Sequence, residues 1–308
     1  YYVLATLLPI DKIIGKIYPI FAIALIFMAA GILFMIFWHH PALPELTDGI
    51  ANTHPDGLPI FPMMFISIAC GAISGFHATQ SPLMARCMTN EKYGRPVFYG
   101  AMITEGIVAL IWAAAATYFF HTEEGSALFA AGSGNDNAAV IVDSITKEWL
   151  GVVGGFLAIL GVIAAPITSG DTAFRSARLI VADFLRVDQK PILKRLMISV
   201  PLVVAGYIIL HANFSVLWRY FAWCNQTLAV FTLWALTVYL TQKRKPYVIT
   251  LIPALFMTAV CSTYILIARE GLHLPQELAY WLGGAVTLFI FVLFLVWRNK
   301  YLRRNPTI

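Results

Sequence analysis

Long uninterrupted apolar runs are the feature of this sequence that most limits its fold. A helix needs about 20 mostly apolar residues to cross the hydrocarbon core of a bilayer, and here only 12% of the residues are charged. The runs are continuous rather than alternating, which favours helices over membrane strands. We therefore expect an all-α integral membrane protein, a polytopic helical bundle. Eight runs are long enough to span: 17–38, 59–80, 97–120, 149–183, 196–211, 217–242, 247–268 and 277–297.

The first nine residues also have the composition of membrane sequence. Residues 1–9 resemble the end of a further span and follow no signal-peptide pattern. We expect the chain to be the later part of a longer protein, with residues 1–308 in a single transmembrane domain. The cysteines fit neither a zinc site nor a disulfide framework, so we interpret them as packing residues. They are Cys70, Cys87, Cys224 and Cys261. We also expect no metal or other cofactor.

Basic residues are concentrated in every second loop between the predicted spans. If the loop that contains Lys12 and Lys16 is cytoplasmic, every Lys and Arg except Lys147, Arg219 and Arg269 lies on the cytoplasmic side. This distribution obeys the positive-inside rule and places the C-terminus in the cytoplasm. Since topology accounts for the net charge of +5, we expect no nucleic-acid partner. The expected partners are the lipid bilayer and a small-molecule substrate, and no oligomeric state is indicated.

One predicted span is unusually polar, in the segment "GAISGFHATQSPLMAR" at residues 71–86. Glycine and serine weaken its helix near residues 74–75, and Ser81-Pro82 is a helix-start signal. We therefore predict a helix from 59 to about 73, an irregular stretch over 74–81 and a second helix from 82 to about 92. The alternative is a continuous span to Gln80 followed by a surface helix.

A helix broken at membrane depth has chemical consequences. Irregular backbone survives there only where protein or a water-filled cavity satisfies its polar groups. The break presents N–H groups on one side and carbonyls on the other. That arrangement suits an anionic substrate or a cation.

A second prediction concerns the outer segment "GSGNDNAAVIVDSITKEW". Asn135 or Asp136 could cap a short helix that runs through Lys147. Such a helix would lie at the membrane surface as a lid, and the alternative is an ordered loop without a gating role. Its apolar side would carry Val140, Ile141 and Ile145.

Several other polar residues fall inside predicted spans. Glu105 has no basic partner within a helical turn, so it must be paired elsewhere, face water or be protonated and carry a proton. The alternative is a structural hydrogen bond to a neighbouring helix. Asn225 and Gln226 either line a path or join helices, whereas Trp218 and Tyr220 are typical of an interfacial aromatic belt.

The span 149–183 contains "APITSGDTAFRSAR", which combines hydroxyls, carbonyls and a carboxylate. These are the oxygen ligands that a hard cation prefers. Asp171 and Arg175 could equally form an i, i+4 ion pair. The residues do not separate sodium from a proton here. The candidate cluster is Thr168, Ser169, Asp171 and Thr172.

Four motifs resemble the carbon starvation protein A (CstA) family of bacterial inner-membrane transporters. They are "GAISGFHATQSPLMARC", "GRPVFYGAMITEGIVALIWA", "ITSGDTAFRSARLIVAD" and "WRYFAWCNQTLAV", and the likeness extends from about Lys16 to Lys245. The family is associated with uptake of peptides and of pyruvate. It is grouped with the amino-acid/polyamine/cation superfamily, whose leucine-transporter-like fold is a five-plus-five inverted repeat with two broken helices.

The resemblance implies a numbering of the spans. If residues 1–9 end the fourth span, the span 59–80 is the sixth, which is broken in that fold. The eighth span of sodium-coupled relatives offers neighbouring Thr and Ser to an ion, a role that Thr168 and Ser169 would match. Asp171 beside them departs from a strict sodium site and keeps proton coupling open. The first repeat lies outside this chain.

We therefore expect a secondary active transporter, a symporter of the bacterial inner (plasma) membrane that imports pyruvate or short peptides in the carbon-starvation stress response. A proton is the expected coupling ion and sodium the alternative. His77 is a candidate charge sensor. The expected substrate-binding residues are Ser74, Gly75, Phe76, His77, Thr79, Gln80, Ser81, Asn225 and Gln226. The expected coupling residues are Glu105, Thr168, Ser169, Asp171 and Thr172.

Two other classes of protein compete with this interpretation. A channel or membrane sensor would keep the broken helix without ion coupling. An intramembrane enzyme or redox subunit is less favoured, because the H-E-x-x-H motif is absent and His77 is the only histidine well inside a span. We expect no enzymatic activity.

Overall fold

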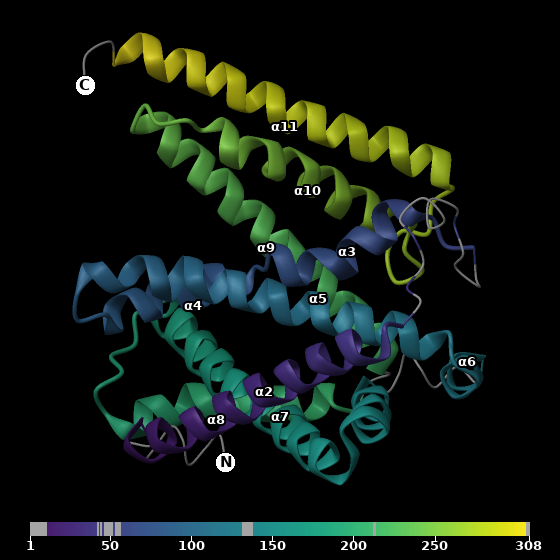
Figure 1. Cartoon of the computed structure of the whole chain (residues 1–308). Helices are drawn as coiled ribbons and strands as arrows, with labels where there is room; N and C mark the ends of the chain where they lie inside the picture. Colours follow the sequence, from purple (N-terminus) through teal and green to yellow (C-terminus); the bar gives the residue numbers. More distant parts are fainter. Residues whose placement is uncertain are drawn as a thin grey trace. The chain divides into compact units, whose positions relative to one another are not determined.

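A computed structural model describes residues 11–41, 43, 45, 52, 57–130, 138–211 and 214–305. Every regular element within these ranges is a helix or a helical turn (Figure 1). In chain order they are α2 (Asp11–His39), α3 (Ile60–Ala72), α4 (Phe76–Cys87), the 3₁₀ turn η2 (Glu91–Tyr93), the π-helical turn η3 (Arg95–Gly100), α5 (Ala101–Phe120), α6 (Glu123–Ala130), α7 (Ala138–Phe184), α8 (Ile192–Ile209), α9 (Phe214–Gln242), α10 (Val248–Ile267) and α11 (Gln276–Arg304).

Six helical segments in the described ranges are long and apolar enough to cross a membrane. They coincide with six of the eight predicted spans, so the prediction of an all-α, multi-pass membrane protein is confirmed. The other two predicted spans correspond to α3 with α4 and to the later part of α7. The six segments are 19–39, 91–120, 192–209, 216–242, 248–267 and 276–304.

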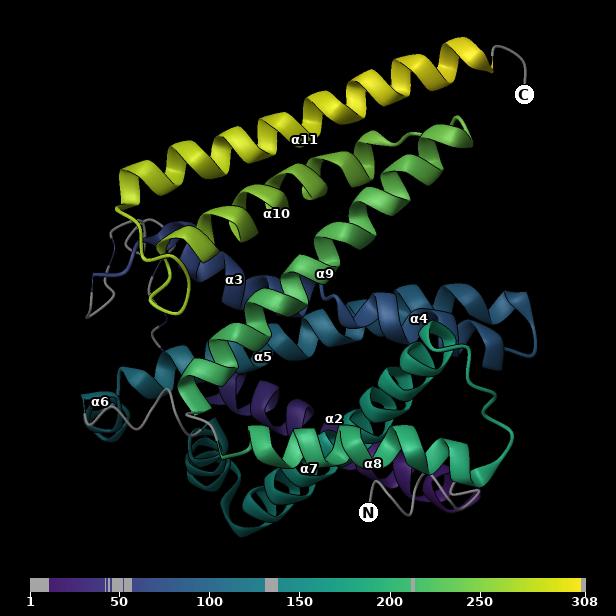
Figure 2. The same cartoon turned by 180° about the vertical axis from the view of Figure 1, so that it is seen from behind.

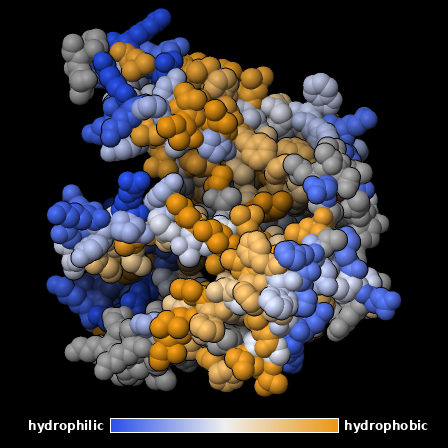
Figure 3. Space-filling model, viewed as in Figure 1, coloured by the Kyte–Doolittle hydropathy of each residue, from blue (hydrophilic) through white to orange (hydrophobic). Residues whose placement is uncertain are grey.

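Hydrophobic side chains cover much of the visible surface (Figure 3). Val152, Phe184 and Trp281 are each more than 80% exposed. An apolar surface of this extent in a chain with few charges is the surface that a bilayer solvates.

The contacts divide the chain into two compact units. The first contains residues 1–46 and 88–215, and in it α2 packs against α7 and α5. The core between these helices includes Met28, Ile32, Ala115 and Phe119, and all four are at most 2% exposed. This core also receives Ile145 from the first part of α7.

Helix α7 is bent at Gly151, whose φ of 63° lies in the left-handed region that favours glycine. The part before the bend corresponds to the predicted outer helix, and its predicted caps lie outside the described residues. Ile145 is buried and Ile141 packs against the core, whereas Val140 is 40% exposed. One flank of this part of α7 therefore faces protein.

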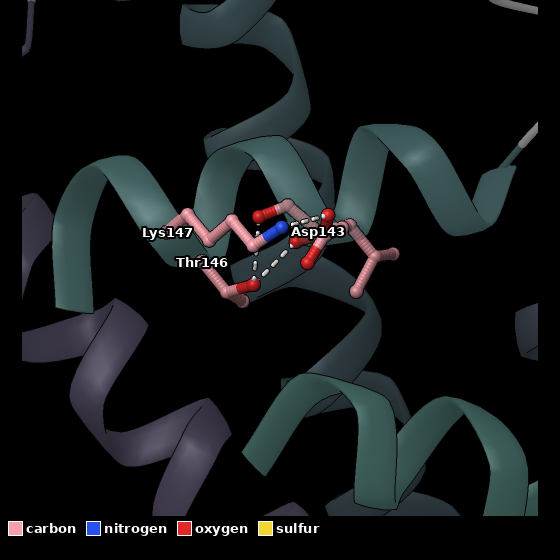
Figure 4. Close-up of polar contacts among 4 residues, drawn as sticks. Asp143, Thr146 and Lys147 are labelled. Atoms are coloured by element: carbon pink, nitrogen blue, oxygen red, sulfur yellow. Dashed lines mark hydrogen bonds and ion pairs between the residues drawn. The ribbon is translucent and has the colours of Figure 1, made fainter. Parts of the chain in front are cut away.

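The other flank of the same helix is polar (Figure 4). The Lys147 ammonium lies 2.6 Å from the Asp143 carboxylate, one turn earlier. Thr146, next to this flank, is completely buried, and its hydroxyl donates to the Val142 and Asp143 carbonyls. Because the ion pair is partly solvent-exposed, it contributes at most about 0.5 kcal/mol to helix stability.

The second unit contains residues 47–87 and 216–308. Helices α10 and α11 lie side by side in both views (Figures 1 and 2), and α10 also packs against α3. A Cβ at Gly283 of α11 would lie 2.1 Å from Thr263 Oγ1, so glycine allows this close approach. Two indole N–H groups of α9 bond to α10, from Trp223 to the Cys261 carbonyl and from Trp234 to the Thr258 hydroxyl, both at 3.0 Å.

Candidate functional site

The predicted helix break is present in the second unit. Helix α3 ends at Ala72, Ile73 is extended with φ −140° and ψ 94°, and α4 begins at Phe76. The break therefore covers residues 73–75. It is shorter than the predicted stretch of 74–81 and ends earlier.

The predicted restart at Pro82 is wrong, because an earlier serine caps the second helix. Ser74 Oγ accepts the Phe76 N–H at 3.2 Å, and the Ser74 carbonyl accepts the His77 N–H at 3.2 Å. These are the contacts of an N-cap residue. Once α4 has started there, Ser81 and Pro82 fall inside it, and the helix ends at Cys87 rather than near residue 92.

His77 strengthens the start of α4. Its Nδ1 lies 2.7 Å from the Ser74 carbonyl oxygen. Because a carbonyl only accepts hydrogen bonds, this contact assigns the proton to Nδ1. The imidazole is therefore oriented by the break itself.

The break contacts α9 through two adjacent residues. Asn225 Nδ2 donates to Ser74 Oγ at 3.1 Å, and the Ser74 hydroxyl lies 3.2 Å from Asn225 Oδ1. A Cβ added to Gly75 would lie 2.2 Å from the Asn225 carbonyl oxygen and 2.7 Å from Leu228 Cβ. Only glycine fits this approach without movement of one backbone. Ser74, Gly75 and Asn225 are thus brought together from distant parts of the sequence.

The other predicted substrate-binding residues occupy α4 and α9. Thr79 donates to the Phe76 carbonyl at 3.0 Å, and Gln80 Nε2 lies 3.5 Å from Thr79 Oγ1, so these contacts are local to α4. Phe76 is 41% exposed, and Ser81 is half-buried. Gln226 is completely buried in α9.

The predicted coupling residues belong to the first unit. Glu105 is exposed on α5, and no ion pair of Glu105 occurs among the residues that the structure describes. The predicted cluster lies on α7, which is helical throughout that stretch. Ser169 is exposed and Thr172 is half-buried, while the side chains of Thr168 and Asp171 lie outside the described part.

A polar group of the second unit was not predicted. Glu270 follows α10, and only 5% of its side chain is exposed. Its Oε1 accepts the Tyr264 hydroxyl at 2.6 Å and lies 3.3 Å from Arg219 Nε, while its backbone carbonyl accepts the Tyr220 hydroxyl. The sequence places Arg219 and Glu270 in different outer segments, so only the folded contact shows that they pair.

Comparison with known proteins gives a consistent assignment. The family model described as carbon starvation protein CstA matches residues 1–150 and 120–264. An uncharacterized membrane protein of Haemophilus influenzae is 44% identical over 141 residues, which cover 40% of this chain and 38% of that protein. No solved structure matches the chain.

Two further relatives carry functional names. The pyruvate/proton symporter BtsT of Escherichia coli is 41% identical over 78 residues, covering 25% of this chain and 11% of BtsT. The peptide transporter CstA of Bacillus subtilis is 25% identical over 281 residues, covering 76% of this chain and 47% of that protein. The chain thus spans less than half the length of either transporter. Because the family model matches most of its residues, the chain belongs to the carbon starvation protein CstA family.

Proposed function

We propose that this chain is the later part of a secondary active transporter that imports a small carboxylated nutrient, pyruvate or a short peptide. The observation that carries the proposal is the break between α3 and α4, where Ser74 and Gly75 contact α9. Broken helices at membrane depth hold substrates and ions in many transporters. The names of the relatives, a pyruvate/proton symporter and a peptide transporter, agree with this substrate class.

The start of α4 offers donors to a carboxylate. The Phe76 N–H points at the Ser74 hydroxyl, and a substrate carboxylate could replace that hydroxyl as acceptor. The Asn225 amide, which now donates to Ser74 Oγ, would supply a second donor. His77 would sense the added negative charge. The proposed site is completed by Gly75, Thr79, Gln80, Ser81 and Gln226.

Coupling is proposed for the first unit. Glu105 would carry the proton, because a carboxylate on an apolar span is costly unless it has a function. The α7 residues Thr168, Ser169, Asp171 and Thr172 would form the ion or proton site. Sodium remains the alternative ion, since hydroxyls and carbonyls also suit it.

The wider arrangement follows from the same proposal. Residues 1–308 would form one transmembrane domain, the later part of a leucine-transporter-like inverted repeat. The protein would lie in the bacterial inner membrane with a cytoplasmic C-terminus and act in the carbon-starvation response without a cofactor. The alternation of basic loops supports this orientation.

The test is uptake of labelled pyruvate and of a labelled dipeptide by the full-length protein in proteoliposomes. We expect one of the two to accumulate against its gradient, and a protonophore to abolish the accumulation. Uptake that ignores the protonophore but requires a sodium gradient would select sodium. Equilibration without accumulation under either gradient would select the channel, and uptake of neither compound would contradict the substrate class.

A further inference from the structure

A cavity of about 500 Å³ lies in the second unit, beside the Glu270 network. Residues from α9, α10 and the segment after α10 line it, together with Leu58 and Met63. Its volume is typical of small-molecule sites, which occupy roughly 300–1,000 Å³. Neither Ser74 nor Asn225 lines the cavity, so it is separate from the helix break.

The walls of this cavity are apolar, but its charges are unbalanced. Met63, Ile267 and Leu274 supply hydrophobic surface, while Arg219 and Arg269 bring two guanidinium groups. The one carboxylate in the lining, Glu270, already accepts from Tyr264 and pairs with Arg219 Nε. One positive charge in excess therefore lies next to apolar surface.

Pairing with Glu270 does not account for both arginines, and Arg269 is exposed at the cavity. A single arginine is sufficient to pair with Glu270, and no ion pair of Arg269 occurs within the described ranges. Arg219 and Arg269 are also two of the three basic residues that the predicted topology places on the outer side. The positive-inside rule therefore does not explain their presence.

We propose that this cavity binds a soluble carboxylate with an apolar body, such as the C-terminal end of a short hydrophobic peptide. Arg269 pairs with the carboxylate, and Arg219 contributes its terminal NH₂ groups while Nε stays on Glu270. The apolar walls receive the hydrophobic side chain. This second site does not depend on transport through the helix break.

The test uses the full-length protein in nanodiscs and labelled N-acetylleucine as the probe, with N-acetylleucinamide as the uncharged match. We expect the amide to bind at least about tenfold more weakly, because it cannot form charge-assisted hydrogen bonds. Arg269→Gln should weaken N-acetylleucine binding by a similar factor. Lys245→Gln removes the same charge from the exposed loop before α10 and should leave binding unchanged.

Three results would overturn the proposal. One is equal binding of the acid and the amide, which would make the cavity a nonpolar void. Another is loss of N-acetylleucine binding when phosphatidylglycerol replaces neutral lipid, which would make it a lipid site. The third is binding that disappears in Gly75→Ala but persists in Arg269→Gln, because the ligand would then occupy the helix break and the proposed function would stand alone.

Discussion

Two polar runs inside predicted spans behave differently. A break over residues 73–75 overlaps the start of the run at 74–81, whereas the run at 168–172 in α7 stays helical. Both contain serine, threonine and glycine. The break has an N-cap at Ser74 and a neighbouring helix that accepts its close approach at Gly75. Polar residues alone therefore do not break a membrane helix; a cap and a partner helix accompany the break.

The largest effect is expected from Gly75→Ala. The added Cβ would lie 2.2 Å from the Asn225 carbonyl oxygen, so either the break or α9 must move. Overpacking of this kind costs about 1–3 kcal/mol, and we expect uptake to be abolished. Gly284→Ala is the matched control, because nothing lies within 4 Å of a Cβ there. Wild-type uptake by Gly75→Ala in proteoliposomes would refute the close contact with α9.

Glu105→Gln tests whether coupling is separate from the break. We expect loss of gradient-driven accumulation, because the neutral amide cannot carry a proton, while substrate exchange continues. Counterflow and protonophore-sensitive uptake, measured on the same vesicles, distinguish the two activities. Accumulation at the wild-type rate would show that Glu105 is structural.

Asn225→Ala should have a smaller effect than either change. It removes both hydrogen bonds to Ser74, which together stabilise the contact by about 1–3 kcal/mol. We expect the apparent KM for the transported carboxylate to rise about tenfold and the thermal unfolding temperature to fall slightly. An unchanged KM would remove Asn225 from the substrate site.

The smallest effects compare the two serines. Ser74→Ala should lower the free energy of unfolding by about 1 kcal/mol, because it removes the N-cap of α4. Ser81→Ala lies inside α4 and should change it by less than about 0.5 kcal/mol. Denaturant unfolding in a mild detergent measures both. A larger loss of unfolding free energy for Ser81→Ala than for Ser74→Ala would indicate that Ser81 is the cap and that the second helix starts at Pro82.

Much of the architecture could be predicted because the bilayer imposes it. Span length and continuous hydrophobicity identified six of the helices, with ends that differ by at most seven residues. Glycine and serine near residue 74 predicted that the helix is broken there. They did not predict the residue at which the break ends. Ser74 and Ser81 are equally good caps in sequence, and the contact between Ser74 and Asn225 is what the sequence could not display.

The polar network around Glu270 also depends on contacts between distant residues that the sequence does not predict. Arg219, Tyr264 and Glu270 are unremarkable when read along the chain, since arginine and glutamate are common in outer loops. Their pairing depends on how the segment after α10 returns to the start of α9. The bend in α7 at Gly151 falls close to the predicted boundary between the outer helix and the span 149–183, but a glycine in an apolar run does not specify a positive φ.

The central claim, that the break at residues 73–75 binds the transported carboxylate, is tested most directly by substrate protection. Ser74→Cys and Met84→Cys are introduced singly into a cysteine-free protein, and the rate of maleimide modification is measured with and without pyruvate or a dipeptide. Met84 is exposed on α4 and lies outside the proposed site. We predict that the transported compound slows modification at position 74 and leaves position 84 nearly unchanged. Protection at 84 but not at 74, or at neither position, would contradict the account.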